Sequence, residues 1–328
     1  MNMNSHPSNH LELQCEYVST HGLAFLCDQT VSPCGRKRFM YAWDPNISET
    51  GTTVYTNCRH MIKLMQMIDT YEAPIIIVVG GDDHLAPSGY SEWVQNKVKT
   101  SPNVLAVLAQ NCCETDKTSK WKHLPIGLDY HTLLWSAEEG DCHEWGASAT
   151  ALDQEALLKS IRMTMRPIYD APYSTVITNF HLAMDAPKRR AKLRQPIYHA
   201  CKNTPWITWL PQQTREEFWR SCNDCAFVLC PPGNGYDTHR AWEALCLGRI
   251  PIIQDLPINE VYRDLPVWIV SDWNHFAQLT VDDLKRVWSD MVSKWKEYKW
   301  HKLRLQYWKN YIRHIKNEVV QEDGAKAN

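Results

Sequence analysis

The sequence contains no long apolar segment, and this absence bears on whether the chain spans a membrane or carries a secretion signal. Its apolar runs, such as residues 75–79, are far below the ~20 residues that a helix needs to cross a bilayer. The polar start, residues 1–14, also lacks the apolar stretch of a secretion signal. The sequence therefore predicts a soluble, cytoplasmic protein without a transmembrane segment.

An excess of charge of either sign is missing as well. Lys and Arg together number 35 and Asp and Glu 37, which leaves a net charge of −2. A nearly neutral chain has no overall attraction to nucleic acid or to an anionic membrane.

The sequence also lacks solenoid repeats. No G-x-G-x-x-G follows the first expected strand of either half, which argues against a dinucleotide-dependent dehydrogenase.

The twelve cysteines do not form a recognisable metal or disulfide framework. Their even number permits disulfides, but several lie inside apolar stretches, where a reduced cysteine packs as a small hydrophobic residue. Cys222 and Cys225 form a C-x-x-C pair, yet no second pair follows at a zinc-ribbon distance. We expect most of the cysteines to be free thiols.

What the chain does contain is a globular composition and an alternating order of strands and helices. Hydrophobic residues make up 44% of its 328 residues, enough for two domains of ordinary size. The many Trp and Tyr residues suit core packing or stacking against sugars. Alternating strands and helices favour parallel α/β sheets. In the first half we expect a helix ending near residue 70, strands at 75–79, 103–108 and 124–126, and a helix at 91–100.

The second half predicts a similar unit followed by a helical tail. A helix over 152–165 stops before Pro167, where we place the domain link. Strands are expected at 174–177, 205–210, 226–230, 250–253 and 267–270, with a helix at 214–221. From Thr280 the pattern is helical with a break near Trp300, and we expect disorder at 321–328. The predicted division is 1–165, 166–290 and a C-terminal helix, 291–328, packed across both domains.

Residues 226–255 carry the densest functional pattern in the chain. A short apolar strand leads into a loop with Gly233 and Gly235, which let a backbone approach a ligand closely. A helix begins at Asp237 or Thr238, and Gly248 ends it. Unpaired backbone N–H groups and the helix dipole meet at the start of such a helix, so the unit is suited to bind an anion.

The helix in this unit separates its residues by face, at about 100° per residue. Its apolar residues share one side, and His239, Arg240 and Glu243 share the other, where they can face a cleft. The planar guanidinium of Arg240 suits a phosphate, and the carboxylate of Glu243 suits the paired hydroxyls of a ribose. The alternative is a solvated ion pair between Arg240 and Glu243 on an exposed helix.

This unit resembles the C-terminal signature of the exostosin-like glycosyltransferases, including short, anchor-free forms that some viruses encode. The resemblance rests on PGNGYDTHRAWEAL and LGRIP within residues 232–251, on AQNC at 109–112 followed by LPIGLDYH at 124–131, and on Gly81-Asp82 after an apolar strand. These segments follow one another in the expected order.

The resemblance implies an α/β protein with two facing Rossmann-like domains, the GT-B type, and a C-terminal helical tail. The C-terminal domain binds the donor, a nucleoside-diphosphate sugar such as UDP-xylose, UDP-glucuronic acid or a UDP-N-acetylhexosamine. The N-terminal domain binds an oligosaccharide or glycoprotein acceptor. The reaction is expected to invert configuration and to need neither metal nor cofactor. The alternative is a catalytically silent protein that binds nucleotide sugar or glycan through the same fold.

The residues expected to bind the donor lie in the glycine loop, the helix after it, and two segments near the start of the second domain. They are Gly233, Asn234, Gly235, Tyr236, Asp237, His239, Arg240, Glu243, Asn179, His181, Arg189 and Arg190. The last two belong to a basic run, residues 188–194, that alternatively forms a solvated turn.

An inverting transfer also needs a base for the acceptor hydroxyl. The expected catalytic residues follow strands of the first domain: Asp82, Asp83, Asp129 and His131. Asp82 is the first choice because it directly follows a buried strand, and its alternative role is a turn or helix cap. An acidic pair such as Asp82-Asp83 also suits a metal, but metal-dependent transferases bind their nucleotide on that same domain, so we expect none.

Overall fold

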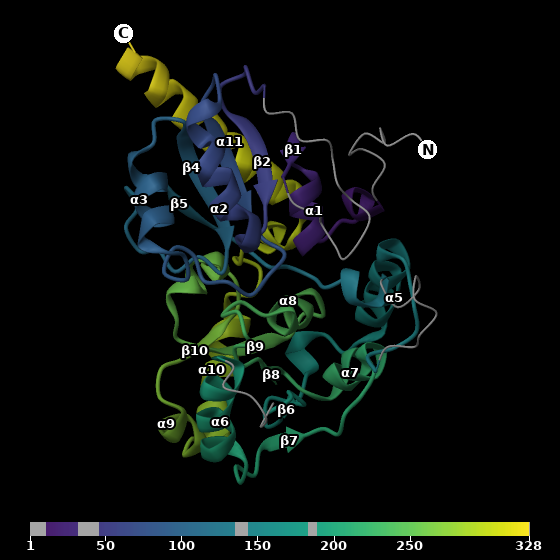
Figure 1. The fold of residues 1–328 in the computed structure, drawn as a ribbon. Coiled ribbons are helices and arrows are strands. Elements are labelled where there is room, and N and C mark those ends of the chain that lie inside the picture. Colours follow the sequence, from purple (N-terminus) through teal and green to yellow (C-terminus); the bar gives the residue numbers. More distant parts are fainter. Residues whose placement is uncertain (1–10, 32–45, 135–143, 183–188, 328) are drawn as a thin grey trace. The chain divides into compact units, whose positions relative to one another are not determined.

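The computed structural model describes residues 11–31, 46–134, 144–182 and 189–327. The chain forms two compact α/β units, Met1–Ile126 with Arg304–Asn328, and Gly127–Leu303 (Figure 1). Residues 127–165, which the sequence placed in the first domain, thus belong to the second unit. Long-range hydrogen bonds tie this segment to the second unit, because Asp129 and Gln154 both accept hydrogen bonds from Arg215.

The first unit contains a five-stranded sheet whose strands follow chain order, β1-β2-β3-β4-β5. All neighbouring strands are parallel. The strands are β1 Gln29–Thr30, β2 Thr52–Thr56, β3 Ile75–Val79, β4 Val104–Gln110 and β5 Trp121–Leu124. β3 is buried along its whole length, as an all-apolar central strand predicts. β5 begins three residues before the predicted strand, and the sequence did not predict β1 or β2.

Helices cover both faces of this first sheet. α2 (Cys58–Met67) and α3 (Glu92–Thr100) pack into one core cluster with alternate residues of β3. The predicted apolar face of α2 is confirmed, since Met61 and Leu64 are at most 2% exposed. α11 (Leu305–Ala327) packs against β4, and α1 (Thr20–Phe25) packs against α11 (Figure 1).

The predicted disorder at the end of the chain is wrong for residues 321–327, because α11 continues to Ala327. Trp308, Ile312 and Ile315 in its first half are at most 7% exposed. A helix anchored in this way extends by one backbone hydrogen bond per added residue, without a new nucleation cost.

The second unit contains a sheet in which strand order departs from chain order, β10-β9-β8-β6-β7. All its neighbouring strands are parallel. The strands are β6 Val176–Thr178, β7 Ile207–Trp209, β8 Phe227–Leu229, β9 Ile250–Gln254 and β10 Trp268–Val270, which confirms all five predicted strands within two residues. The chain passes from β6 to β7 and then returns to place β8 on the other side of β6. Ligands of open parallel sheets bind at such a switch point, at the carboxyl ends of the strands.

The helices of the second unit are α5 Ala151–Thr164, α6 Arg189–Cys201, α7 Arg215–Ser221, α8 His239–Cys246, α9 Trp273–Ala277 and α10 Val281–Ser293. The predicted glycine stop of α8 is confirmed, because Gly248 has φ +68°, a conformation that side chains with a Cβ rarely adopt. The basic run, for which a solvated turn was the alternative, begins α6 from Arg189 onward. Within the described residues, no helix combines the length and apolarity that a membrane crossing requires.

Candidate functional site

Two loops that carry predicted donor-binding residues meet at the switch point of the second sheet. Asn179 and His181 follow β6, and Gly233 follows β8. The strand ends lie side by side, since the Thr178 hydroxyl donates a hydrogen bond to the Leu229 carbonyl at 3.0 Å. The fold therefore brings together segments that lie more than fifty residues apart in the sequence.

Arg194, from α6, joins these two loops. Its Nε donates to the Pro232 carbonyl at 2.8 Å and its Nη1 to the His181 carbonyl at 2.9 Å. Arg194 is the last residue of the basic run, but the sequence named only Arg189 and Arg190 of that run as donor-binding residues. Its predicted members Arg189 and Arg190 occupy the first turn of α6, and their side chains lie outside the described part of the structure, as does Lys188.

The glycine loop is closed by a bond from the Gly233 amide to the Gly235 carbonyl, 2.9 Å long. A Cβ added at Gly233 would meet no other atom nearer than 3.7 Å. Packing within the described chain therefore does not require glycine there, and the space beside it is open to a ligand. Asn234 and Tyr236 complete the loop.

The start of α8 rests on buried Asp237. Its carboxylate accepts hydrogen bonds from the Trp242 indole N–H, at 2.9 Å, and from the Tyr262 hydroxyl. Thr238 is the residue that precedes the helix, and its side chain makes no capping hydrogen bond. Asp237 thus fixes the position of the helix start while the first amides of α8 have no side-chain cap from Thr238.

Arg240 lies in the first turn of α8 with its guanidinium held flat. Its central carbon is 3.4 Å from the centre of the Phe218 ring, and its Nε is 3.5 Å from Glu243 Oε2. Nη1 is buried and has no hydrogen-bond partner among the described residues. A pre-oriented guanidinium with an unused donor at a helix N-terminus suits an anionic ligand.

Glu243 is more buried than an open polar face predicts, with 7% of its side chain exposed. One carboxylate oxygen lies 3.8 Å from Arg215 Nε and the other 3.5 Å from Arg240 Nε. The pair with Arg240 exists, but its carboxylate is buried and only the Arg240 side chain, 34% exposed, reaches solvent. The predicted contact of Glu243 with a ribose stays a prediction.

Arg215 connects Glu243 to a second buried carboxylate, Asp129. Its Nη2 donates to Asp129 Oδ2 at 2.8 Å, and Nη1 donates to the Asp129 carbonyl and to Gln154. The sequence did not single out Arg215, which contacts Asp129 across 86 positions. No local pattern indicates that Arg215 contacts Asp129. The capping residue Thr214 indicates only that Arg215 stands at the start of α7.

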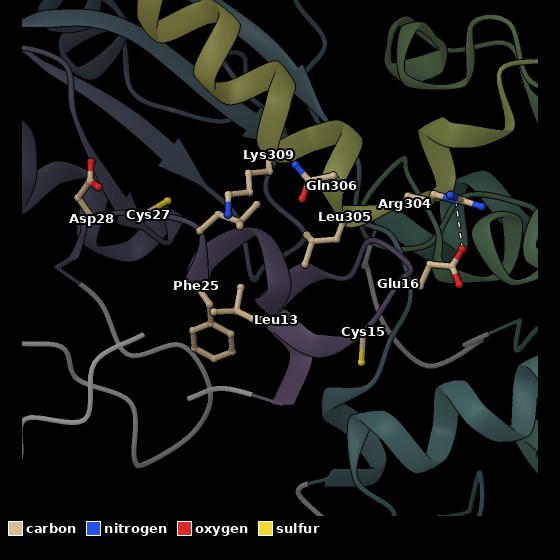
Figure 2. Close-up of a pocket in the computed structure, with 11 residues that line it drawn as sticks. Leu13, Cys15, Glu16, Phe25, Cys27, Asp28, Arg304, Leu305, Gln306 and Lys309 are labelled. Atoms are coloured by element: carbon tan, nitrogen blue, oxygen red, sulfur yellow. Dashed lines mark ion pairs between the residues drawn. The ribbon is translucent and has the colours of Figure 1, made fainter. Parts of the chain in front are cut away.

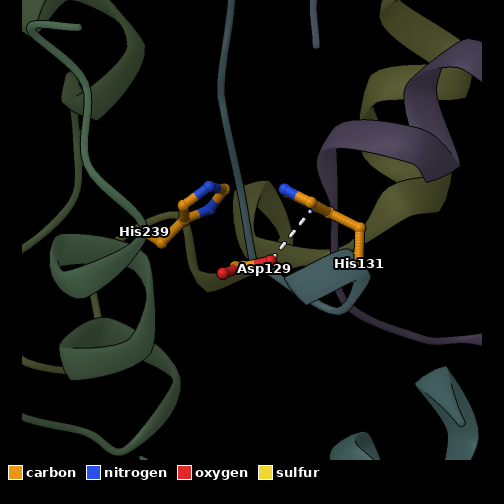
Figure 3. A group of neighbouring side chains, drawn as sticks. All are labelled: Asp129, His131 and His239. Atoms are coloured by element: carbon orange, nitrogen blue, oxygen red, sulfur yellow. Dashed lines mark ion pairs between the residues drawn. The ribbon is translucent and has the colours of Figure 1, made fainter. Parts of the chain in front are cut away.

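Asp129, His131 and His239 form a compact group in this unit (Figure 3). His131 Nδ1 is 3.1 Å from Asp129 Oδ1, and the two imidazole rings meet edge to face with centres 5.7 Å apart. Burial opposes the charged form of Asp129, but His131, Arg215 and His239, with the Thr132 hydroxyl, outweigh it and hold the pKa of this carboxyl well below its usual range.

The hydrogen bonds of this group define which nitrogen of each imidazole carries a proton. An ionised carboxylate and a carbonyl can only accept. His131 Nδ1 therefore donates to Asp129, and His239 Nδ1 donates to the Gly127 carbonyl at 2.7 Å. In the neutral form of each ring, the proton-accepting nitrogen is then Nε2. The sequence had named all three residues, Asp129 and His131 as catalytic residues and His239 as a donor-binding residue.

Asp82, the predicted base, has the geometry of its alternative role as a cap. Its Oδ2 accepts from the Cys58 amide at the start of α2, at 2.7 Å, and its Oδ1 accepts from the His84 amide at 2.9 Å. Asp83 beside it is exposed. Both lie in the first unit, whereas Asp129 and His131 lie in the second.

The first unit also has a cavity of about 750 Å³ between α1 and the start of α11 (Figure 2). Its apolar floor includes Phe25 and Leu305, and its rim carries an ion pair between Glu16 and Arg304, 3.1 Å apart. None of the residues predicted to bind donor or act as base lines this cavity.

The chain matches no protein-family model and no curated protein.

Proposed function

We propose that the chain is a glycosyltransferase of the GT-B type that moves a sugar from a UDP-sugar to a glycan hydroxyl with inversion. One observation carries the proposal. The segment that resembles the exostosin-like signature lies at the only strand-order reversal of the described sheets, next to the loops after β6 and β8. Arg240 presents an unused donor there. This is where an open parallel sheet binds nucleotides.

In the proposed reaction the donor diphosphate binds at the N-terminus of α8. Arg240 and the backbone amides of the loop and helix stabilise the negative charge that develops as the bond between the anomeric carbon and the phosphate oxygen breaks. Positive groups and helix dipoles take the place of a metal ion. The residues of the loop after β6, Asn179 and His181, border the same donor site.

The acceptor oxygen forms the new bond to the anomeric carbon and gives up its proton to a base. The geometry favours His131 for this step over Asp82. Asp129 holds the Nδ1 proton of His131 and stabilises the imidazolium that forms, which leaves Nε2 to accept the acceptor proton. Asp129 itself is a positioning residue, because its own oxygens are occupied by Arg215, Thr132 and His131.

The test is UDP release from a panel of UDP-sugars, with and without oligosaccharide acceptors, in excess EDTA. The proposal predicts release that requires both donor and acceptor and survives EDTA. Donor binding without UDP release from any pair would instead identify a catalytically silent nucleotide-sugar-binding protein. Loss of activity in EDTA with rescue by manganese would contradict metal-independent catalysis.

A further inference from the structure

We propose that Asp129, His131 and His239 form a binding site for a zinc-like divalent metal ion. One ligand atom from each of these side chains lies within 4.8 Å of the other two. Figure 3 shows the two imidazoles on either side of the carboxylate. Across the described ranges, no other set of three His, Cys, Asp or Glu side chains is grouped so closely.

The spacing within the group fits a single ion. Asp129 Oδ1 and His131 Nδ1 are 3.1 Å apart. Two ligands of a tetrahedral zinc ion are separated by about 3.3 Å when each bond is ~2.0–2.1 Å long. When the ion binds, it displaces the proton shared between these two atoms, and His239, whose ligand atom lies within 4.8 Å of the other two, supplies the third ligand.

The surrounding hydrogen bonds orient the ligands in the manner of a metal site. His239 donates from Nδ1 to the Gly127 carbonyl, which leaves its Nε2 lone pair available to the ion. Asp129 Oδ2 is held by Arg215 at 2.8 Å and by the Thr132 hydroxyl at 2.7 Å. Metal-binding histidines and carboxylates commonly have such outer partners, and these contribute to affinity.

The ligand types select the class of metal. Two imidazole nitrogens and one carboxylate suit zinc or cobalt, whereas magnesium requires a shell of oxygen ligands. Asp129 and Glu243 balance the guanidinium groups of Arg215 and Arg240, so the ion enters a group without net positive charge. The fourth coordination position is left for water.

One consequence rests on the proposed function. A metal ion in this group ties up the Asp129–His131 pair and so competes with proton transfer by His131. Zinc is therefore expected to inhibit the transferase and EDTA to relieve that inhibition, which is compatible with metal-independent catalysis.

The direct test is a zinc titration of the metal-stripped, full-length protein against a chromophoric zinc indicator. Because cysteine thiols also bind zinc, the informative quantity is a difference between variants. Wild type is expected to bind one equivalent more than His239→Ala and His131→Gln, or to bind that equivalent at least about tenfold more tightly. His199→Ala, which removes an exposed histidine of α6, should match wild type, and millimolar Mg²⁺ should not displace the zinc.

Circular dichroism and thermal melts of each variant establish that it is folded, and either histidine variant alone suffices for the comparison. Equal zinc stoichiometry and affinity in wild type and in the folded variants would overturn the proposal and assign the bound zinc to thiols. No donor or acceptor is present in this titration. Its failure is therefore distinguishable from failure of the glycosyltransferase proposal, which is judged by UDP release.

Discussion

The hydrogen bonds of two single residues, His131 and Asp82, distinguish the two candidates for the general base. His131 is oriented by Asp129, whereas both oxygens of Asp82 accept backbone hydrogen bonds. We expect His131→Asn to lower turnover by about 10²–10⁴-fold while UDP affinity is kept, because loss of a general base removes only the proton-transfer contribution. Steady-state turnover and calorimetric UDP binding measure the two effects separately.

Asp82→Asn is the matched comparison for this base. It should retain most of the turnover and lower the free energy of unfolding by about 0.5–1.5 kcal/mol, because the amide keeps one accepting oxygen and loses one of the two backbone hydrogen bonds. If Asp82→Asn loses turnover and His131→Asn does not, the assignment of the base to His131 is wrong and the sequence-based choice holds.

Lys302 gives a prediction about pH. It is 6% exposed, its ammonium donates to the Arg263 carbonyl at 2.7 Å, and burial lowers its pKa to about 8. Between that value and about 10.4, the usual lysine pKa, the unfolded chain holds a proton that the folded chain has lost. The folded state therefore gains stability as pH rises through this window.

Urea unfolding of wild type and Lys302→Met measures this effect. The stability of wild type relative to the variant should increase from about pH 7.5 to about pH 9.5. A difference that is constant over this interval would show that the proton on Lys302 is held equally in both states.

The residues of the candidate site were predictable to the extent that short motifs mark them. Asp129 and His131 stand in the LPIGLDYH segment and His239 in the glycine-loop unit, so the sequence identified each of them. Their grouping was not predictable, because it depends on Arg215 and on backbone carbonyls, which leave no local pattern. The cap role of Asp82 was foreseen as an alternative, since an Asp after a strand often caps a turn.

At the scale of elements, length and periodicity decided what the sequence could show. The five apolar residues of β3 and the helical stripe of α2 are strong local signals, and both were located to within a few residues. β1 has only two residues and is defined by its pairing with β2, which no local pattern encodes. The sequence predicted disorder at the end of α11 because the last residues are polar. The helix is held by buried residues in its first half.

The anchor of α11 can be tested with two tryptophans. Trp308 on α11 is 4% exposed and Trp93 on α3 is 48% exposed. Trp308→Ala should lower the free energy of unfolding by about 3–5 kcal/mol, as expected for truncating a buried aromatic residue. Trp93→Ala should cost about 1 kcal/mol or less.

Denaturant unfolding followed by circular dichroism measures both variants under the same conditions. Similar losses for the two substitutions would mean that α11 is not part of the packed core of the first unit.

At the scale of the whole molecule, the two sheets differ in a way that no local pattern reveals. The first sheet keeps chain order and the second reverses it between β6 and β8. The sequence predicted two parallel α/β domains because strands and helices alternate, but strand order depends on long-range pairing. The reversal provides a physical reason, independent of the family resemblance, to place a nucleotide in the second unit.

The most direct test of this placement is calorimetric titration of UDP into wild type, Arg240→Gln and Arg220→Gln. Arg220, an exposed arginine on α7 that pairs with Glu216, is the control for loss of a guanidinium. We predict that wild type binds UDP, that Arg240→Gln binds it at least about tenfold more weakly, a loss of ~1.4 kcal/mol, and that Arg220→Gln matches wild type. No UDP binding by the folded wild type, or equal affinity in all three proteins, would contradict a nucleotide site at the start of α8.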